Sequence, residues 1–123
     1  MVPSPWQFVA LLAVHWLGDF VLQSRWMSVN KSKRLDALSL HAMTYTGTLL
    51  VGSGLIFGLR QIGLLVLFVG ANGVLHFATD FVTSRITSRL WYQQREHDFF
   101  VMVGLDQLIH QITLATTLWF IFT

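Results

Sequence analysis

The chain has 123 residues, of which 54% are hydrophobic and only 11% charged, with a mean hydropathy of +0.58 and a formal net charge of +2. Because an ordinary soluble domain has about 25% charged residues, this composition indicates an integral membrane protein in a lipid bilayer. The small net charge gives no argument for a nucleic-acid partner, and a sequence without cysteine excludes disulfides, thiolate metal ligands and a thiol nucleophile.

Four apolar segments follow along the chain, each close to the ~20 residues that cross a hydrocarbon core of ~30 Å. They are expected at about residues 5–26, 35–59, 62–82 and 99–122, the third continuing as an amphipathic helix to residue 92. The first is interpreted as a retained span, because no Lys or Arg precedes it as in a secretory signal. We therefore predict an all-α fold: residues 1–123 form one domain, an integral membrane bundle of four transmembrane helices.

The positive residues indicate how this bundle is oriented. Seven of the eight Lys and Arg residues lie in or beside the first and third connections, and only Arg60 lies in the second, very short one. Cytoplasmic loops carry an excess of Lys and Arg, so the expected location is the bacterial inner (cytoplasmic) membrane, multi-pass, with both termini outside. The spacing of Gly54 and Gly58 additionally predicts a close approach between helices.

Each of three acidic residues expected inside spans has a histidine four residues away, on the same helix face. The stretches are HWLGD (residues 15–19), HFATD (76–80) and DQLIH (106–110). The order reverses on the last helix, so the aspartates lie roughly 8–12 Å from the cytoplasmic boundary and the histidines roughly 14–18 Å. His41, roughly 9–10 Å deep and nearest the mouth, completes a ring to which all four helices contribute.

Imidazoles and carboxylates together suit a divalent metal, here expected to be zinc. Helix bundles build such sites from inward-facing residues on neighbouring helices. The predicted metal ligands are His15, Asp19, His76, Asp80, Asp106 and His110. His41 is predicted to act as a catalytic base or an extra ligand, and Arg25, Lys31 and Arg85 are candidates to hold a substrate phosphate or an anionic lipid.

This pattern supports a metal-dependent hydrolase that acts at the cytoplasmic leaflet on a lipid-linked or phosphate-bearing substrate, because a bound metal makes water a nucleophile near neutral pH. The same residues suit a proton or metal-ion conduit, which is expected to be a homo-oligomer since four short helices rarely enclose a pore. A small phage membrane protein of the holin type is a third hypothesis. In a fourth hypothesis, the three His–Asp pairs only fix the packing of the helices through hydrogen bonds.

The stretches HWLGDFVLQSRWM, NKSK, NGVLHFATDFVTSR and GLDQLIHQ, together with His41, resemble a family of small bacterial and phage integral membrane proteins described only as a domain of unknown function. This resemblance covers nearly the whole chain and implies no activity. The chain is more loosely similar to the membrane-bound metal-dependent hydrolases, multi-helix proteins with recurring His and Asp in their spans. That likeness implies metal ligation by His15, Asp19, His41, His76, Asp80, Asp106 and His110.

Overall fold

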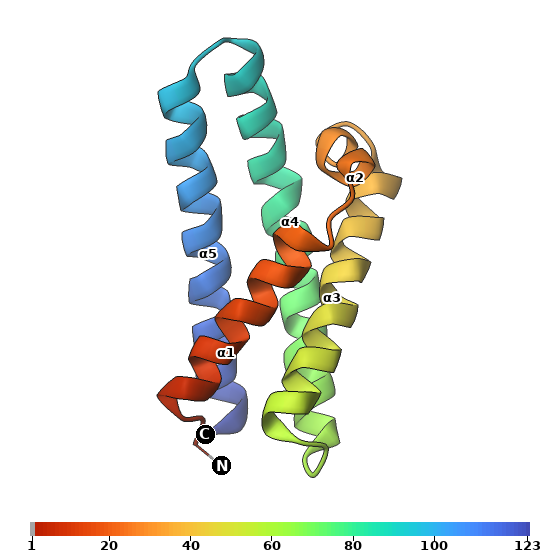
Figure 1. The fold of residues 1–123 in the computed structure, drawn as a ribbon, viewed down its shortest axis with the longest axis vertical. Coiled ribbons are helices and arrows are strands. Elements are labelled where there is room, and N and C mark those ends of the chain that lie inside the picture. Colours follow the sequence, from red (N-terminus) through yellow and green to blue (C-terminus); the bar gives the residue numbers. More distant parts are fainter. Residues whose placement is uncertain (1) are drawn as a thin grey trace.

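The computed structural model describes residues 2–123, which form helices and no strand (Figure 1). The elements are α1 (Pro5–Trp16), a π-helical turn η1 (Leu17–Val21), α2 (Arg25–Asn30), α3 (Leu35–Phe57), α4 (Ile62–Tyr92) and α5 (Glu96–Phe122). This confirms the all-α prediction. Three helices, α3, α4 and α5, are long and apolar enough to cross a membrane. A fourth span is not confirmed, because the first apolar segment is divided.

The first segment begins as expected but ends early. Ser4 caps α1 with a capping box to Gln7, and Pro5 occupies the first turn, where its missing N–H costs nothing. The predicted end near residue 26 is wrong, because the helix stops at Val21 and Ser24 starts a new one by accepting a hydrogen bond from the backbone N–H of Met27. Part of the expected polar connection is therefore the short helix α2.

The later helices follow the predicted segments closely. Helix α3 ends at Phe57 because Gly58 adopts a φ of +76°, which favours glycine. Helix α4 runs without a break to Tyr92, as expected for its amphipathic extension. The predicted close approach at residues 54 and 58 is wrong, since Gly58 lies in the turn and a Cβ on Gly54 would make only ordinary contacts.

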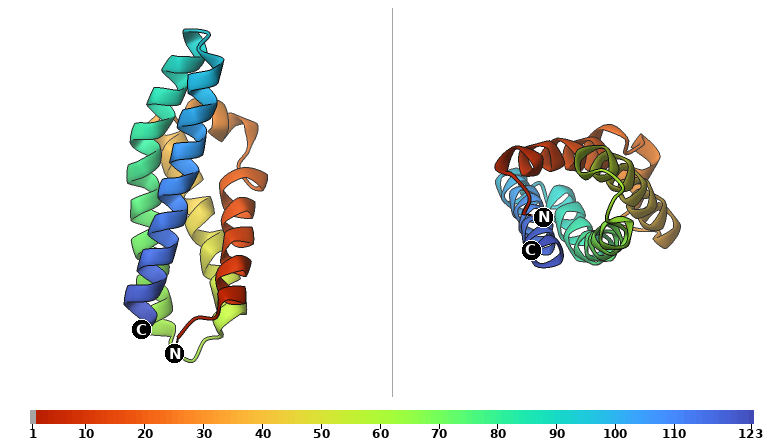
Figure 2. Two further views of the ribbon diagram at one scale, coloured as in Figure 1. Left: turned by 90° about the vertical axis from the view of Figure 1, so that its left-hand side faces the viewer. Right: turned by 90° about the horizontal axis from the view of Figure 1, so that it is seen from below.

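Helices α1, α3, α4 and α5 surround a common centre when the molecule is seen along its length (Figure 2). Both termini and the α3–α4 turn lie at one end, and α2 and the α4–α5 turn lie at the other (Figure 1). Two other glycines allow the close packing. A Cβ on Gly52 would lie 2.5 Å from methyl groups of Val14 in α1, and one on Gly73 would lie 2.5 Å from Thr46 Oγ1 in α3.

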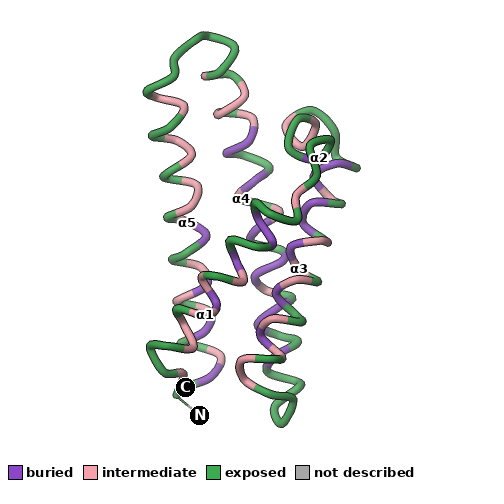
Figure 3. The backbone as a smooth tube through the Cα atoms, in the orientation of Figure 1, coloured by how far each residue is buried: buried purple, intermediate pink, exposed green. Residues whose placement is uncertain are grey.

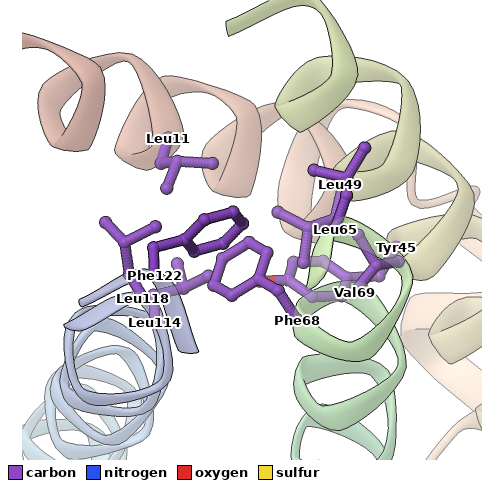
Figure 4. Close-up of a cluster of buried hydrophobic side chains, with 9 residues drawn as sticks. All are labelled: Leu11, Tyr45, Leu49, Leu65, Phe68, Val69, Leu114, Leu118 and Phe122. Carbon is purple, nitrogen blue, oxygen red and sulfur yellow. The ribbon is translucent and has the colours of Figure 1, made fainter. Parts of the chain in front are cut away.

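Buried residues line the inner faces of the helices, while the far half of the α4–α5 hairpin stands clear of the bundle (Figure 3). The half of the bundle near the termini has an apolar core drawn from α1, α3, α4 and α5 (Figure 4). Its members are Leu11, Tyr45, Leu49, Leu65, Phe68, Val69, Leu114, Leu118 and Phe122. The outer surface is also apolar, with Leu55 and Phe120 more than 80% exposed, as expected for helices that contact lipid.

Candidate metal centre

The apolar core ends where a layer of buried polar residues begins. His15 lies one helical turn after Leu11, and His110 lies one turn before Leu114, so each helix changes from apolar to polar at the same level. His15, His41, His76 and His110 are each at most 3% exposed, and Asp19 and Asp80 are at most 4% exposed. The structure thus brings the predicted imidazoles and carboxylates together inside the bundle.

Four of these side chains direct one atom each to a common point. His41 Nε2 lies 3.1 Å from Asp19 Oδ1 and 3.0 Å from Asp80 Oδ2. His76 Nε2 lies 3.4 and 3.5 Å from the same two oxygens, and the two Nε2 atoms are 3.0 Å apart. Tetrahedral ligands at ~2.0–2.1 Å from a zinc ion are about 3.3 Å from one another. These four atoms could therefore hold a divalent metal ion.

The contact between the two imidazoles also suits a bound cation. Two nitrogens 3.0 Å apart cannot both direct an N–H at each other, so His41 or His76 presents a lone pair to this point. Within residues 2–123, the Nδ1 atoms of both rings are buried without a hydrogen-bond partner. The nearby carboxylates of Asp19 and Asp80 add buried negative charge, which is costly unless it is paired or bound to a metal.

A second group lies beside the first. Asp19, Asp106 and His110 each offer a ligand atom within 4.8 Å of the others. His110 Nε2 lies 3.3 Å from Asp106 Oδ1 and 3.0 Å from Asp80 Oδ1, the carboxylate oxygen that the first group does not use. Thr83 Oγ1 donates a hydrogen bond to Asp106 Oδ1 and thereby holds that carboxylate in place.

His15 has a different environment from the other three imidazoles. Its Nδ1 lies 2.9 Å from the hydroxyl of Tyr45, and its Nε2 lies 2.9 Å from Gln107 Oε1 and 3.6 Å from Asp19 Oδ2. Gln107 in turn donates from Nε2 to both Asp19 and Asp106. His15 belongs to neither group of candidate ligand atoms, so its role as a ligand stays a prediction.

Sequence reasoning missed Gln107 and Tyr45. Tyr45 follows His41 by four residues and so shares its helix face, which was a usable signal. Gln107 lies three residues before His110, and residues at this spacing are also neighbours on a helix surface, so the same signal applied to it. Its long side chain reaches across to Asp19.

The closest contacts join different helices. The three pairs four residues apart on one helix are separated by 3.6, 3.5 and 3.3 Å, whereas contacts between helices fall to 3.0 Å. Asp19 lies in the π-helical turn η1. Such turns are rare in proteins as a whole, but where they occur they are often part of a functional site. The preceding Gly18 makes room there, because a Cβ on it would lie 3.1 Å from the ring of Tyr45.

A cavity of about 700 Å³ reaches these carboxylates from the end of the molecule that carries α2. Asp19, Asp80 and Asp106 line it, whereas the four histidines lie behind them. The expectation that His41 is nearest the mouth is therefore wrong, since His41 is 0% exposed. The physical reason is that its imidazole turns inward to meet the two carboxylates that face the cavity.

The three predicted phosphate-binding residues occupy different places. Lys31 is the C-cap residue of α2 and lines the cavity, with its Nζ 3.1 Å from Asp80 Oδ2. Arg85 lines a neighbouring cavity of about 460 Å³ together with Lys33 and Arg89. Arg25 is exposed on α2 and lines neither of these two cavities.

Neither the curated proteins nor the solved structures contain a match to this chain. The looser likeness to membrane-bound metal-dependent hydrolases thus has no support from these comparisons. One family model does match, over residues 7–123, and its description is "Protein of unknown function (DUF3307)". Since that match spans nearly the whole chain, the protein belongs to the DUF3307 family.

Proposed function

We propose that the protein is a membrane-embedded, metal-dependent hydrolase that acts at the cytoplasmic leaflet on a lipid-linked or phosphate-bearing substrate. The observation that carries this proposal is the group of two imidazole nitrogens and two carboxylate oxygens, with contacts of 3.0–3.5 Å, whose carboxylates line an open cavity. Zinc is the metal that this mixture of nitrogen and oxygen ligands suits. A site that only fixed helix packing would have no need of a cavity.

The proposed membrane placement uses α1 together with η1 as a fourth, shorter span. Pro5–Val21 covers about 26 Å at 1.5 Å per residue, slightly less than a hydrocarbon core of ~30 Å. The end of the bundle that holds α2 and the α4–α5 turn is the cytoplasmic one in this proposal, because its connections carry most of the Lys and Arg residues. Both termini then lie outside the bacterial inner membrane.

In this proposal each polar residue has a task. Asp19, His41, His76 and Asp80 bind the metal, so His41 serves as the extra ligand rather than as the base. His15 orients Gln107, which holds Asp19 and Asp106. The ammonium group of Lys31 faces the substrate phosphate. His15 as a direct metal ligand is the alternative, and the metal content of a His15→Ala variant decides between the two.

The walls of the cavity suit a substrate with an apolar part. Phe20, Trp91, Phe99 and Phe100 line it, and aromatic side chains supply large apolar surfaces for a lipid chain. A metal held by Asp19, His41, His76 and Asp80 would supply an activated water for the hydrolysis of a phosphate ester in this cavity. Gln23 Oε1 and Ser84 Oγ are buried polar atoms without a protein partner within residues 2–123, and both residues line this cavity.

The apolar core favours a hydrolase over a conduit. An ion that left the polar layer toward the termini would meet Leu11, Phe68 and Leu114, which are all 0% exposed. Burying an unpaired ion among such side chains is strongly unfavourable. The site is therefore open at one end and closed at the other, as a binding pocket is.

The test begins with metal content. Detergent-purified protein is equilibrated with zinc and dialysed, and the bound metal is compared among the wild type, His76→Ala and the control His97→Ala, whose exposed imidazole lies outside both groups. We expect at least one equivalent in the wild type and the control, and less than half in His76→Ala. Release of inorganic phosphate from vesicles that contain phosphatidate is then measured with the same three proteins.

Each outcome separates the hypotheses. Metal-dependent phosphate release by the wild type and His97→Ala, but not by His76→Ala, supports the hydrolase. A wild type without bound metal contradicts it. Zinc flux across proteoliposomes that is abolished by Asp106→Asn would instead support the conduit.

A further inference from the structure

We infer that the bundle holds a second divalent cation beside the first, bound by Asp19, Asp106 and His110, and that the two cations share the carboxylates of Asp19 and Asp80. This inference rests on the proposed metal site and extends it to a dinuclear centre. It also defines the substrate class, because two adjacent cations suit the oxygens of a phosphate group.

The shared carboxylates are the first step of the argument. Asp80 directs Oδ2 to His41, at 3.0 Å, and Oδ1 to His110, also at 3.0 Å. Asp19 directs Oδ1 to His41, at 3.1 Å, and also offers a ligand atom within 4.8 Å of those of Asp106 and His110, while its Oδ2 accepts a hydrogen bond from Gln107. A carboxylate whose two oxygens face two different groups of ligands is placed to bridge two metal ions, which lie about 3.5–4 Å apart in two-metal sites.

The second group supplies ligands that the first leaves unused. His110 is 2% exposed, and its Nε2 lies 3.3 Å from Asp106 Oδ1. Asp106 is 15% exposed at its side chain and lines the cavity, whereas His41 and His76 do not. The second cation would therefore lie nearer the cavity than the first and closer to an incoming substrate.

The balance of charge then indicates which anion would accompany the second cation. With neutral imidazoles, three carboxylates and the ammonium group of Lys31 leave two negative charges in the buried layer. One divalent cation neutralises them. A second cation leaves two positive charges, which are unfavourable in a buried layer without an anion. The dianion of a phosphate group restores neutrality, so the second cation and a phosphate are expected to bind together.

The experiment counts metal ions in the presence of inorganic phosphate. The full chain in detergent is equilibrated with zinc and phosphate, and bound zinc is measured for the wild type, Asp106→Asn, His76→Ala and the control His97→Ala. We expect about two equivalents for the wild type and the control and about one for Asp106→Asn. Circular dichroism checks that each variant keeps the helical content of the wild type.

A second measurement uses the wild type alone and so does not depend on the folding of variants. Manganese replaces zinc, inorganic phosphate is kept in the solution, and the electron paramagnetic resonance spectrum of manganese is recorded as the metal is added. The first equivalent is expected to give the six-line signal of an isolated ion, and the second is expected to weaken and broaden that signal because two neighbouring ions couple magnetically.

The outcomes distinguish this inference from the proposed function. Two equivalents in the wild type with one in Asp106→Asn support the second site. One equivalent in both proteins, lost in His76→Ala, overturns the second site and leaves the mononuclear proposal intact. No bound zinc in the wild type overturns both. Two manganese ions that keep an undiminished six-line signal contradict a shared, dinuclear centre.

Discussion

Replacement of Lys31 by methionine should strengthen metal binding, because the ammonium group and the metal compete for one oxygen. Lys31 Nζ lies 3.1 Å from Asp80 Oδ2, which is also one of the four atoms of the first candidate metal group. A cation that binds Oδ2 must approach this positive charge or displace it. Methionine keeps much of the length and apolar stem of lysine without the charge.

The size of the effect follows from these distances. A metal ion ~2.1 Å from Oδ2 would lie at most about 5 Å from Nζ. Repulsion between charges of +1 and +2 at that distance is about 1.7 kcal/mol in water and about 7 kcal/mol at an effective permittivity of 20. The side chain of Lys31 is 20% exposed and can turn into the cavity, which places the result near the lower value. We therefore expect the Kd for zinc to fall by about tenfold, which corresponds to ~1.4 kcal/mol.

The assay is a competition titration of zinc against a chelating dye, with Lys33→Met as the matched control. Lys33 lines the same cavity, but its Nζ lies 5.9 Å from the ring centre of Tyr92. The control should bind zinc with nearly the wild-type Kd. Without metal, Lys31→Met should unfold at a lower temperature than the wild type, because Asp80 loses a charged hydrogen bond of about 1.5–3 kcal/mol. A zinc affinity of Lys31→Met that is equal to or weaker than that of the wild type would refute the idea that the ammonium group and the metal compete for Asp80.

Other predictions concern packing, the role of His15 and the anion. Gly73→Ala should lower stability by about 1–3 kcal/mol in thermal unfolding because of the contact with α3, whereas Gly104→Ala, which faces open space, should be neutral or stabilising. Tyr45→Phe should lower the free energy of unfolding by about 1 kcal/mol, because the hydrogen bond between Tyr45 and His15 is lost. It should leave zinc binding unchanged, and an altered zinc stoichiometry would contradict this expectation. His15→Ala should retain at least one equivalent of zinc, and a metal-free variant would show that His15 is a ligand. Inorganic phosphate should tighten binding of the second zinc equivalent, and by linkage zinc should tighten phosphate binding by the same factor. Calorimetric titrations in both orders check this.

Much of the fold could be predicted because a helix in a lipid bilayer needs an apolar outer face and must keep its ionisable residues on an inner face. Hydropathy indicates the first of these faces, and the spacing of His and Asp indicates the second. A buried ionisable group needs a partner, so the three motifs indicated one polar face per helix. The register of that face followed from a rise of 1.5 Å per residue, which placed residues from separate segments at similar depths. The α3–α4 turn was also predictable, because only a few polar residues separate two apolar runs.

The rest depended on contacts between helices, which periodicity does not specify. The π-helical turn at Asp19 and the break before Ser24 arise within the segment expected to be one span, and the capping residue Ser24 gives the local signal for the break. Tyr45 and Gln107 share helix faces with predicted ligands, but their contacts with His15 follow from how α1 crosses α3 and α5. Periodicity could group His15 with the metal ligands, but only these partners distinguish its surroundings from those of His41.

The order of the layers along the bundle constrains how a metal ion would reach its ligands. The apolar core closes the side toward the termini, so the ion would have to arrive through the cavity. There it would meet the carboxylates before the imidazoles, since Asp19, Asp80 and Asp106 line the cavity and the histidines lie behind them. Lys31 already contacts one of these carboxylates and must give way. The displaced ammonium group would remain in the cavity beside the metal, where an arriving phosphate group would require positive charge.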